Sequence, residues 1–295
     1  MPTLERRAEQ FEEHRAHLRA VAYRMLGSAS EAEDAVQESW IRLGRTDVSA
    51  VENLRAWLTT VVGRVCLDML RTRATRREAP LDENAVHVPD PEITRADDPE
   101  SNAVLADSVG LALLVVLETL EPAERLAFVL HDMFGMTFDE IAPIVDRSPV
   151  AARQLASRAR RRVQASVPDA DRDLRQQRRV VDAFLAAARD GDFERLITVL
   201  DPDMVLRADG GALAGASRVV RGAQAVAGQA AMFSRLGLSN QVVLVNGHVG
   251  VLSRRPDGKL FSVIGFTVAR GKVVEMDILA DPERLSRLDL SAIES

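Results

Sequence analysis

The segment 137–163 constrains the fold most, because it combines two helix-start signals separated by a very short break. Thr137-Phe138-Asp139-Glu140 is a capping box, which predicts a short helix that ends near Val145. Ser148 is a good N-cap, and Pro149 suits the first position of a second helix. A short helix, a tight turn and a second helix together predict a helix-turn-helix.

The second of these helices is strongly basic. Residues 147–165 contain six arginines and no acidic residue. Ala151, Leu155, Ala159 and Val163 recur in four-residue steps and are expected to be buried. The opposite face suits DNA, since arginine pairs with phosphates or guanine edges and glutamine with adenine. The candidate DNA contacts are Arg147, Arg153, Gln154, Ser157, Arg158 and Arg161. The alternative is a solvated, arginine-rich face on a helical hairpin.

Two further amphipathic helices are predicted upstream. Ser30-Glu31-Ala32-Glu33 reads as a capping box that opens a helix ending near Gly44. A longer helix, with a basic end, runs from about Leu54 to Thr72. The face of the first helix opposite its apolar stripe carries Asp34, Gln37 and Glu38.

Charge and proline divide the chain into modules. Residues 81–124 hold eleven acidic residues against one arginine, and four prolines fall between Pro80 and Pro99. This stretch reads as a linker, and a second break falls at Val167-Pro168-Asp169. We therefore predict a helical module over 1–79, an acidic, proline-containing linker over 80–101, a helix-turn-helix module over 102–166, a short linker over 167–175 and a C-terminal domain over 176–295.

The C-terminal block changes its hydrophobic period. Helical patterns at about 176–189 and 222–235 precede strand patterns at about 240–245, 249–255, 260–269 and 273–279. Pro256-Asp257-Gly258-Lys259 and Arg270-Gly271 are good hairpin turns. Helices followed by antiparallel strands predict an α+β domain behind two all-α modules.

Composition excludes several classes of protein. A single cysteine, Cys66, rules out an internal disulfide framework and a cysteine-based zinc site. Charged residues from Glu5 onward are incompatible with a secretory signal, and the longest apolar run, Val109–Leu117, is about half a membrane span. We expect a soluble, cytoplasmic protein with no metal and no cofactor.

Three stretches, in this order, resemble a bacterial RNA polymerase sigma factor of the extracytoplasmic-function (ECF) class. Residues 22–40 resemble conserved region two, and residues 53–71 resemble its promoter-melting and minus-ten-reading helix. Ala152-Arg153-Gln154-Leu155-Ala156-Ser157-Arg158-Ala159-Arg160 resembles the region-four recognition helix. The resemblance covers about residues 10–165, and it implies a DNA- and polymerase-binding protein with no catalytic activity.

This resemblance assigns roles to particular residues. It implies that Asp34, Gln37 and Glu38 dock on the β′ clamp helices of the polymerase core, with the β flap as a second contact of the core. The minus-ten set that it implies is Asn53 and Arg55 at the base pocket, with Arg64, Arg71 and Arg73 on backbone phosphates. The minus-thirty-five element would be read by the arginine-bearing face of the recognition helix.

The remaining block resembles a SnoaL-like domain, the cone-shaped α+β fold shared with polyketide cyclases. Sigma factors with such a domain form the SigJ-like subgroup. Its linker and domain signatures are matched in part by His87-Val88-Pro89-Asp90-Pro91 and by Asp209-Gly210-Gly211. We expect the Asp209-Gly210-Gly211 turn to make a regulatory contact, inhibitory or supportive, and the domain to be able to hold an unknown small ligand.

Two rival functions remain open at this point. One is a cyclase- or isomerase-type enzyme tethered to a DNA-binding module, with Asp209, His248 and Asp277 as candidate acid–base residues. The other is an ordinary helix-turn-helix regulator with a sensor domain. The first 80 residues disfavour the second rival, because such a regulator does not need the two N-terminal helices.

Overall fold

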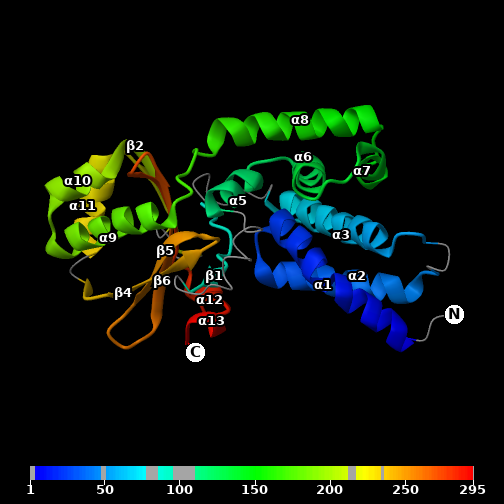
Figure 1. Cartoon of the computed structure of the whole chain (residues 1–295), viewed down its shortest axis with the longest axis horizontal. Helices are drawn as coiled ribbons and strands as arrows, with labels where there is room; N and C mark the ends of the chain where they lie inside the picture. Colours follow the sequence, from blue (N-terminus) through cyan, green and yellow to red (C-terminus); the bar gives the residue numbers. More distant parts are fainter. Residues whose placement is uncertain are drawn as a thin grey trace. The chain divides into compact units, whose positions relative to one another are not determined.

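A computed structural model describes residues 4–47, 51–77, 86–95, 110–211, 217–233 and 236–294. The chain divides into two compact units. The helical unit comprises Met1–Leu81 and Val116–Ser166, and the sheet unit comprises Asp82–Val115 and Val167–Ser295. Figure 1 shows the helices of the first unit and the sheet of the second.

The helical unit begins with three long helices: α1 (Leu4–Leu26), α2 (Ala29–Arg45) and α3 (Leu54–Arg77). Their apolar stripes meet in a core, because each helix is too amphipathic to be stable without burying that stripe. The largest fully buried side chains of these helices are Leu18, Met25, Leu26, Leu43, Leu58 and Leu67.

The start of α2 differs from the expected capping box at Ser30. Ser28 is the N-cap, and its Oγ accepts a hydrogen bond from the Glu31 amide. The Glu31 carboxylate does not fold back on the chain, because it forms an ion pair with Arg73 at the end of α3. A tertiary contact therefore replaces half of the local motif.

The predicted helix-turn-helix is present in the second part of the helical unit. It follows α6 (Pro122–Phe128) and the π-helical turn η1 (Val129–Met133). Its helices are α7 (Phe138–Val145) and α8 (Pro149–Ser166). Both halves of the capping box between Thr137 and Glu140 form, and Ser148 Oγ accepts a hydrogen bond from the Ala151 amide.

The buried face of α8 agrees with the expected one at Ala159 but is shifted by one position in the first part of the helix. Ala152, Ala156 and Ala159 are fully buried, whereas Leu155 and Val163 are only half-buried. The three alanines follow the four- and three-residue spacing of one helix face, and their small size allows close approach of the neighbouring helix.

The sheet unit contains, within its described residues, a seven-stranded sheet in the order β1-β4-β5-β6-β7-β2-β3. All neighbouring strands are antiparallel except β2 and β7, which are parallel. The strands are β1 (Ile93–Thr94), β2 (Leu200–Asp209), β3 (Arg218–Arg221), β4 (Ser239–Val245), β5 (His248–Arg254), β6 (Leu260–Ala269) and β7 (Lys272–Leu279).

Helices pack on this sheet to form one apolar core. They are α9 (Leu174–Asp190), α10 (Phe193–Val199) and α11 (Ala223–Phe233), and the short α12 (Pro282–Leu285) and α13 (Ser291–Glu294) follow the last strand. The helix α5 (Leu111–Glu118) contains a division point between the two units. The α+β fold and the two predicted hairpins are thus observed.

The segment expected to be a linker is structured where it is described. Residues 86–95 belong to the sheet unit, and β1 pairs Ile93 with Val245 at the edge of the sheet. Glu92 and Asn246 extend this pairing, because the Glu92 amide donates to Asn246 Oδ1 at 3.1 Å. The remaining parts of the predicted linker, 80–85 and 96–101, lie outside the described residues.

Candidate functional sites

The outer face of α2 carries the residues predicted to bind polymerase. Asp34 and Gln37 are exposed, and Glu38 is half-buried. Glu38 accepts a hydrogen bond from Arg42 Nε at 2.9 Å. The opposite face of α2 is buried in the core, so the three residues lie together on the solvent side of one rigid helix.

Asn53 and Arg55 lie at the start of α3. Asn53 Oδ1 accepts a hydrogen bond from the Ala56 amide at 3.0 Å, so its side chain caps the helix. Arg55 is exposed, and its Nη2 lies 3.0 Å from His17 Nδ1. His17 Nε2 lies 3.0 Å from Thr59 Oγ1, whose hydroxyl donates to the Arg55 carbonyl.

His17 is a positioning residue that the sequence did not reveal. Burial, together with the charge of Arg55, lowers its pKa to about 4. The ring is therefore neutral at pH 7, so that Nδ1 can accept from Arg55 while Nε2 donates to Thr59. This arrangement directs the Arg55 guanidinium along the surface of α1 and α3.

The three candidate phosphate contacts on α3 differ in their surroundings. Arg71 is exposed. Arg64 donates to the Pro143 carbonyl in α7 at 3.1 Å. Arg73 is half-buried and forms an ion pair with Glu31. Of the three, Arg71 is the most accessible to a nucleic acid in this arrangement of the helical unit.

The candidate DNA contacts in the helix-turn-helix divide into two groups. Arg147, Arg153, Gln154 and Arg161 are exposed, and Ser157 is half-buried. Arg153 lies over the ring of Phe138, with 5.3 Å between its Cζ and the ring centroid. Arg158 belongs to a different group, because its Nε donates to Glu124 Oε1 at 2.7 Å.

Two acidic residues, the buried Glu124 and the more exposed Asp132, form ion pairs with three of the α8 arginines. The Glu124 carboxylate, with only 8% of its side chain exposed, accepts from Arg158 and also from Arg162. Asp132 lies 2.6 Å from Arg160. The charge count of this helix thus overstates the charge available to DNA.

The two predicted helical modules pack against each other within the helical unit. Arg125 Nη1 in α6 donates to the Met25 carbonyl of α1 at 2.8 Å. A Cβ added at Gly63 in α3 would lie 3.4 Å from Leu130 and 3.7 Å from Leu126. Gly63 of α3 thus lies against the apolar side chains of α6 and η1, and the two modules are in direct contact within the helical unit.

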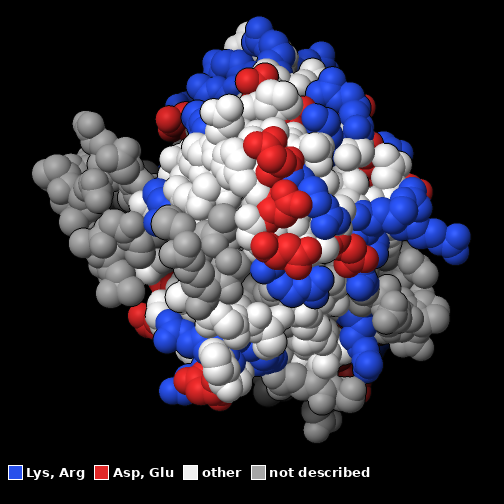
Figure 2. Space-filling model, turned by 90° about the vertical axis from the view of Figure 1, so that its left-hand side faces the viewer, with Lys and Arg blue, Asp and Glu red and all other residues white. Residues whose placement is uncertain are grey.

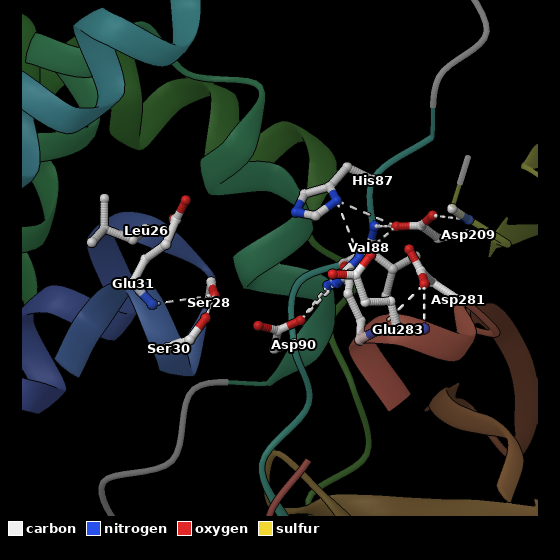
Figure 3. A network of polar contacts seen from close by, with 12 residues as sticks. Leu26, Ser28, Ser30, Glu31, His87, Val88, Asp90, Asp209, Asp281 and Glu283 are labelled. Atoms are coloured by element: carbon white, nitrogen blue, oxygen red, sulfur yellow. Dashed lines mark hydrogen bonds and ion pairs between the residues drawn. The ribbon is translucent and has the colours of Figure 1, made fainter. Parts of the chain in front are cut away.

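The Asp209-Gly210-Gly211 turn contacts the segment 86–95 within the sheet unit (Figure 3). Asp209 is buried, and its Oδ2 accepts from the Val88 amide at 3.0 Å and from Arg284 Nη1 at 2.7 Å. Arg284 in α12 also donates to Asp90 through Nε at 2.8 Å. Arg284 therefore joins the turn to the segment. We call this cluster of Asp209, Arg284, Asp90 and Val88 the Asp209–Arg284 grip. Val88 is fully buried in it.

The charge state of Asp209 suits this role. Burial alone would raise its pKa, but hydrogen bonds from His87, Val88 and Gly211 and the charge of Arg284 lower the pKa to about 2. Asp209 is thus ionised at neutral pH. Gly211 has a φ of +72°, and a Cβ there would collide with the Asp281 carboxylate, which explains the glycine.

The other two candidate acid–base residues are part of the framework. Asp277 is 1% exposed and accepts from Arg207 Nη1 at 3.1 Å, and burial raises its pKa to about 6. His248 Nδ1 lies 3.2 Å from Gln177 Nε2, and burial lowers its pKa. Neither residue lies next to the other candidates in a shared cleft.

A cavity of about 840 Å³ lies between the sheet and the helices α9, α11 and α12. Its described lining is mostly apolar and includes Phe184, Leu206, Val226, Phe261 and Met276. None of the described lining residues is a carboxylate, a histidine or a cysteine. Asp209, His248 and Asp277 are not among them.

The outer surface of the sheet unit carries charges of both signs. Arg178 pairs with Asp182 on α9, and Arg195 lies 3.7 Å from Asp190. Figure 2 shows a face on which acidic side chains lie in the middle and basic ones surround them. This face therefore differs from the single-sign basic surface that is typical of a DNA-binding module.

In the described part of the chain, no group of three or more His, Cys, Asp or Glu residues could hold a metal ion. No helix there has the length and hydropathy needed to cross a membrane.

The fold and these sites define a DNA-binding protein built from two helical modules and an α+β domain, and comparison with known proteins places it in a family. Family models of Sigma-70 region 2 and of Sigma-70, region 4 match residues 10–76 and 110–163. The chain is 38% identical to the ECF RNA polymerase sigma factor SigJ of Mycobacterium tuberculosis, over 94% of this chain and 92% of that protein. It is 36% identical to the probable ECF sigma factor SigI of the same species, over 93% of each chain.

A solved structure agrees with this placement. The crystal structure of Mycobacterium tuberculosis SigJ matches with a TM-score of 0.73 and 34% identity, covering 96% of this chain and 99% of that one. The chain belongs to the family of ECF RNA polymerase sigma factors. It is a promoter-specificity subunit that binds RNA polymerase core and promoter DNA, and its sheet unit is an α+β domain.

Proposed function

We propose that this sigma factor docks on the β′ clamp helices through Asp34, Gln37 and Glu38, and that its helix-turn-helix module contacts the β flap. The exposed acidic face of α2 supports the first assignment, because a rigid row of acceptors can set register with a basic partner and speed its encounter.

Promoter contacts are proposed for the accessible cations. The melted minus-ten strand is contacted by Asn53, Arg55 and Arg71. The exposed face of α8 enters the major groove at the minus-thirty-five element and carries Arg153, Gln154, Ser157 and Arg161. Arg147 contacts DNA phosphates. Arg64 joins the first set once its bond to the Pro143 carbonyl is released. We assign Arg73 and Arg158 mainly to intramolecular ion pairs.

The arrangement in the helical unit is proposed to be a closed state. The two promoter elements lie about 25 base pairs apart, which is roughly 85 Å at about 3.4 Å per base pair. A compact body of about 130 residues has a radius of gyration of only about 14 Å. The two modules must therefore separate before both elements can be bound.

The SnoaL-like domain is proposed to restrain this separation. The two modules are joined by Asp82–Val115, which could extend to about 110 Å if free. The Asp209–Arg284 grip and the edge strand β1 hold part of that segment on the sheet unit. The bonds of Arg284 to both Asp90 and Asp209 are the observation that carries this proposal.

We further propose that this domain regulates without catalysis. A catalytic site needs a positioned acid or base next to the substrate. The described lining of its cavity has Lys259 but no carboxylate or histidine, and it includes none of the candidate acid–base residues Asp209, His248 and Asp277. A tethered cyclase or isomerase is therefore disfavoured.

Run-off transcription with purified polymerase core tests the restraint. Arg284→Met removes the grip, whereas Arg287→Met, a matched control, removes only an exposed pair with Glu283. Losing a charge-assisted contact costs about 1.5 kcal/mol, roughly tenfold in an equilibrium constant. We expect Arg284→Met to increase transcription several-fold at limiting sigma factor, and Arg287→Met to match the wild type. Equal output from all three proteins, or a fall for Arg284→Met, would contradict an inhibitory restraint.

A further inference from the structure

The cavity of the sheet unit contains polar atoms that lack partners. Among the described residues, the buried Gln229 Oε1 in α11 accepts no hydrogen bond, and the buried Arg218 Nε in β3 donates none. Both residues line the cavity. Because nearly all buried polar groups in proteins are paired, two such atoms on residues that line one cavity need an explanation.

The charge of the lining points to the kind of molecule that would satisfy them. The described lining residues include four cations, Arg189, Arg218, Arg255 and Lys259, and no carboxylate. Arg255 lies over the Phe261 ring, 5.1 Å from its centroid, and Arg189 lies 3.8 Å from Asp190. Arg218 has no ion-pair partner among the described residues.

The rest of the lining is apolar, and the cavity is large enough to hold a small molecule. About 840 Å³ lies within the range of small-molecule sites, which bury most of a ligand against apolar side chains and orient it by a few polar groups. Phe184, Met276 and Ile278 supply such walls from α9 and β7. A wholly apolar molecule would leave Arg218 and Gln229 without partners. A strongly polar molecule would place polar groups against the apolar walls and lose the gain from burying them.

We propose that this cavity binds an apolar organic acid that also carries an N–H or O–H donor. The acid group pairs with Arg218, the donor bonds to Gln229 Oε1, and the apolar body fills the space between sheet and helices. The proposal concerns binding alone and does not depend on the regulatory role of the domain.

A fluorescent probe with this chemistry is 8-anilinonaphthalene-1-sulfonate, which combines apolar rings, an N–H and a sulfonate. N-phenyl-1-naphthylamine has the same rings and N–H without the acid. We expect saturable binding of one sulfonate probe per full-length chain. Arg218→Met should weaken that binding about tenfold or more and leave the uncharged probe unaffected. The control is Arg221→Met, an exposed arginine on the same strand and outside the cavity lining, which should change neither.

Competition on the unmodified protein gives an independent measurement that requires no variant to fold. Decanoate should displace the sulfonate probe at lower concentration than decanol, because only decanoate carries the acid.

A second variant tests the donor. Gln229→Leu should weaken binding of the sulfonate probe but not of decanoate, because decanoate is ionised and has no donor for Gln229 Oε1.

Three results would overturn the proposal. They are an absence of saturable binding, equal loss of the sulfonate probe in Arg218→Met and Arg221→Met, and displacement by decanol as readily as by decanoate. Near-UV circular dichroism of each variant separates loss of the site from loss of packing, since this probe also binds exposed apolar surface in partly folded states.

Discussion

Glu124 and Asp132 decide how much of the positive charge on α8 can reach DNA. They form ion pairs with Arg158, Arg160 and Arg162, whose side chains remain about half-exposed, and Arg153 and Arg161 are exposed on the same helix. The sequence predicted an arginine face and its helix correctly. It could not distinguish the arginines by partner, because the acids that pair with them lie 28 to 38 residues away.

This distinction predicts different outcomes for two substitutions. Arg153→Ala should weaken binding to the upstream promoter element by about 1–3 kcal/mol at a base contact, without lowering the melting temperature. Arg158→Ala should instead mainly lower stability, by about 1 kcal/mol, because the buried Glu124 keeps only Arg162 as a partner and the pair is half-exposed. Fluorescence anisotropy with promoter duplex and thermal melts measure both. Unchanged promoter binding by Arg153→Ala would show that α8 does not read DNA through this residue.

Asp277 predicts a pH-dependent stability. Burial raises its pKa to about 6 in the folded protein, above its value of 3.8 as a model compound, so the folded state holds the proton more tightly. The stability associated with this proton is fully present below about pH 4 and is lost as the pH rises through 6. As the pH rises from 4.5 to 7.5, the free energy of unfolding of Asp277→Asn should therefore increase by about 2 kcal/mol relative to that of the wild type. Denaturant melts at the two pH values give this difference, and a pH-independent difference would refute it.

At the scale of elements, the predictions succeeded where the signal was local. The capping box of α7, the start of α8 and the hairpins around Gly258 and Arg270 depend on neighbouring residues, and they form as expected. The strand β2 was not predicted. Its start, Leu200-Asp201-Pro202-Asp203, has the composition of a turn, and the register shift between Leu200 and Val205 accommodates the proline.

The outer face of α2 gives a prediction for the element as a whole. Reversing charge with Asp34→Lys and Glu38→Lys should weaken association with polymerase core, while stability changes by no more than about 0.5 kcal/mol per site. Glu9→Lys with Glu13→Lys is a matched control, since these glutamates are also exposed and one helical turn apart on α1. A pull-down with purified core compares the two pairs. Unchanged core binding by the Asp34→Lys, Glu38→Lys protein, or an equal loss of binding in the control protein, would exclude this face as the polymerase contact.

At the scale of the whole molecule, the units do not follow the order of the chain. The sequence predicts a linker at 80–101 from its acids and prolines, yet residues 86–95 form the edge of the sheet. That contact depends on Asp209, Asn246 and Arg284, which lie far along the chain, so no local pattern could reveal it. The packing of the two helical modules depends equally on distant contacts, such as Arg125 with the Met25 carbonyl.

We propose above all that the C-terminal α+β domain keeps the two helical modules together by holding segment 86–95. Spin labels at Ile41→Cys on α2 and Gln164→Cys on α8 report their separation, since both positions are exposed. The native Cys66 should not react, because it is buried and burial raises the pKa of its thiol.

Pulsed electron paramagnetic resonance then gives the distance distribution in the free protein. We predict one narrow, short distance for the wild type and for Arg287→Met, and an added population at longer distance for Arg284→Met. With polymerase core and promoter DNA, all three should shift to the long distance. A distribution for free Arg284→Met that is identical to that of the wild type would contradict the account.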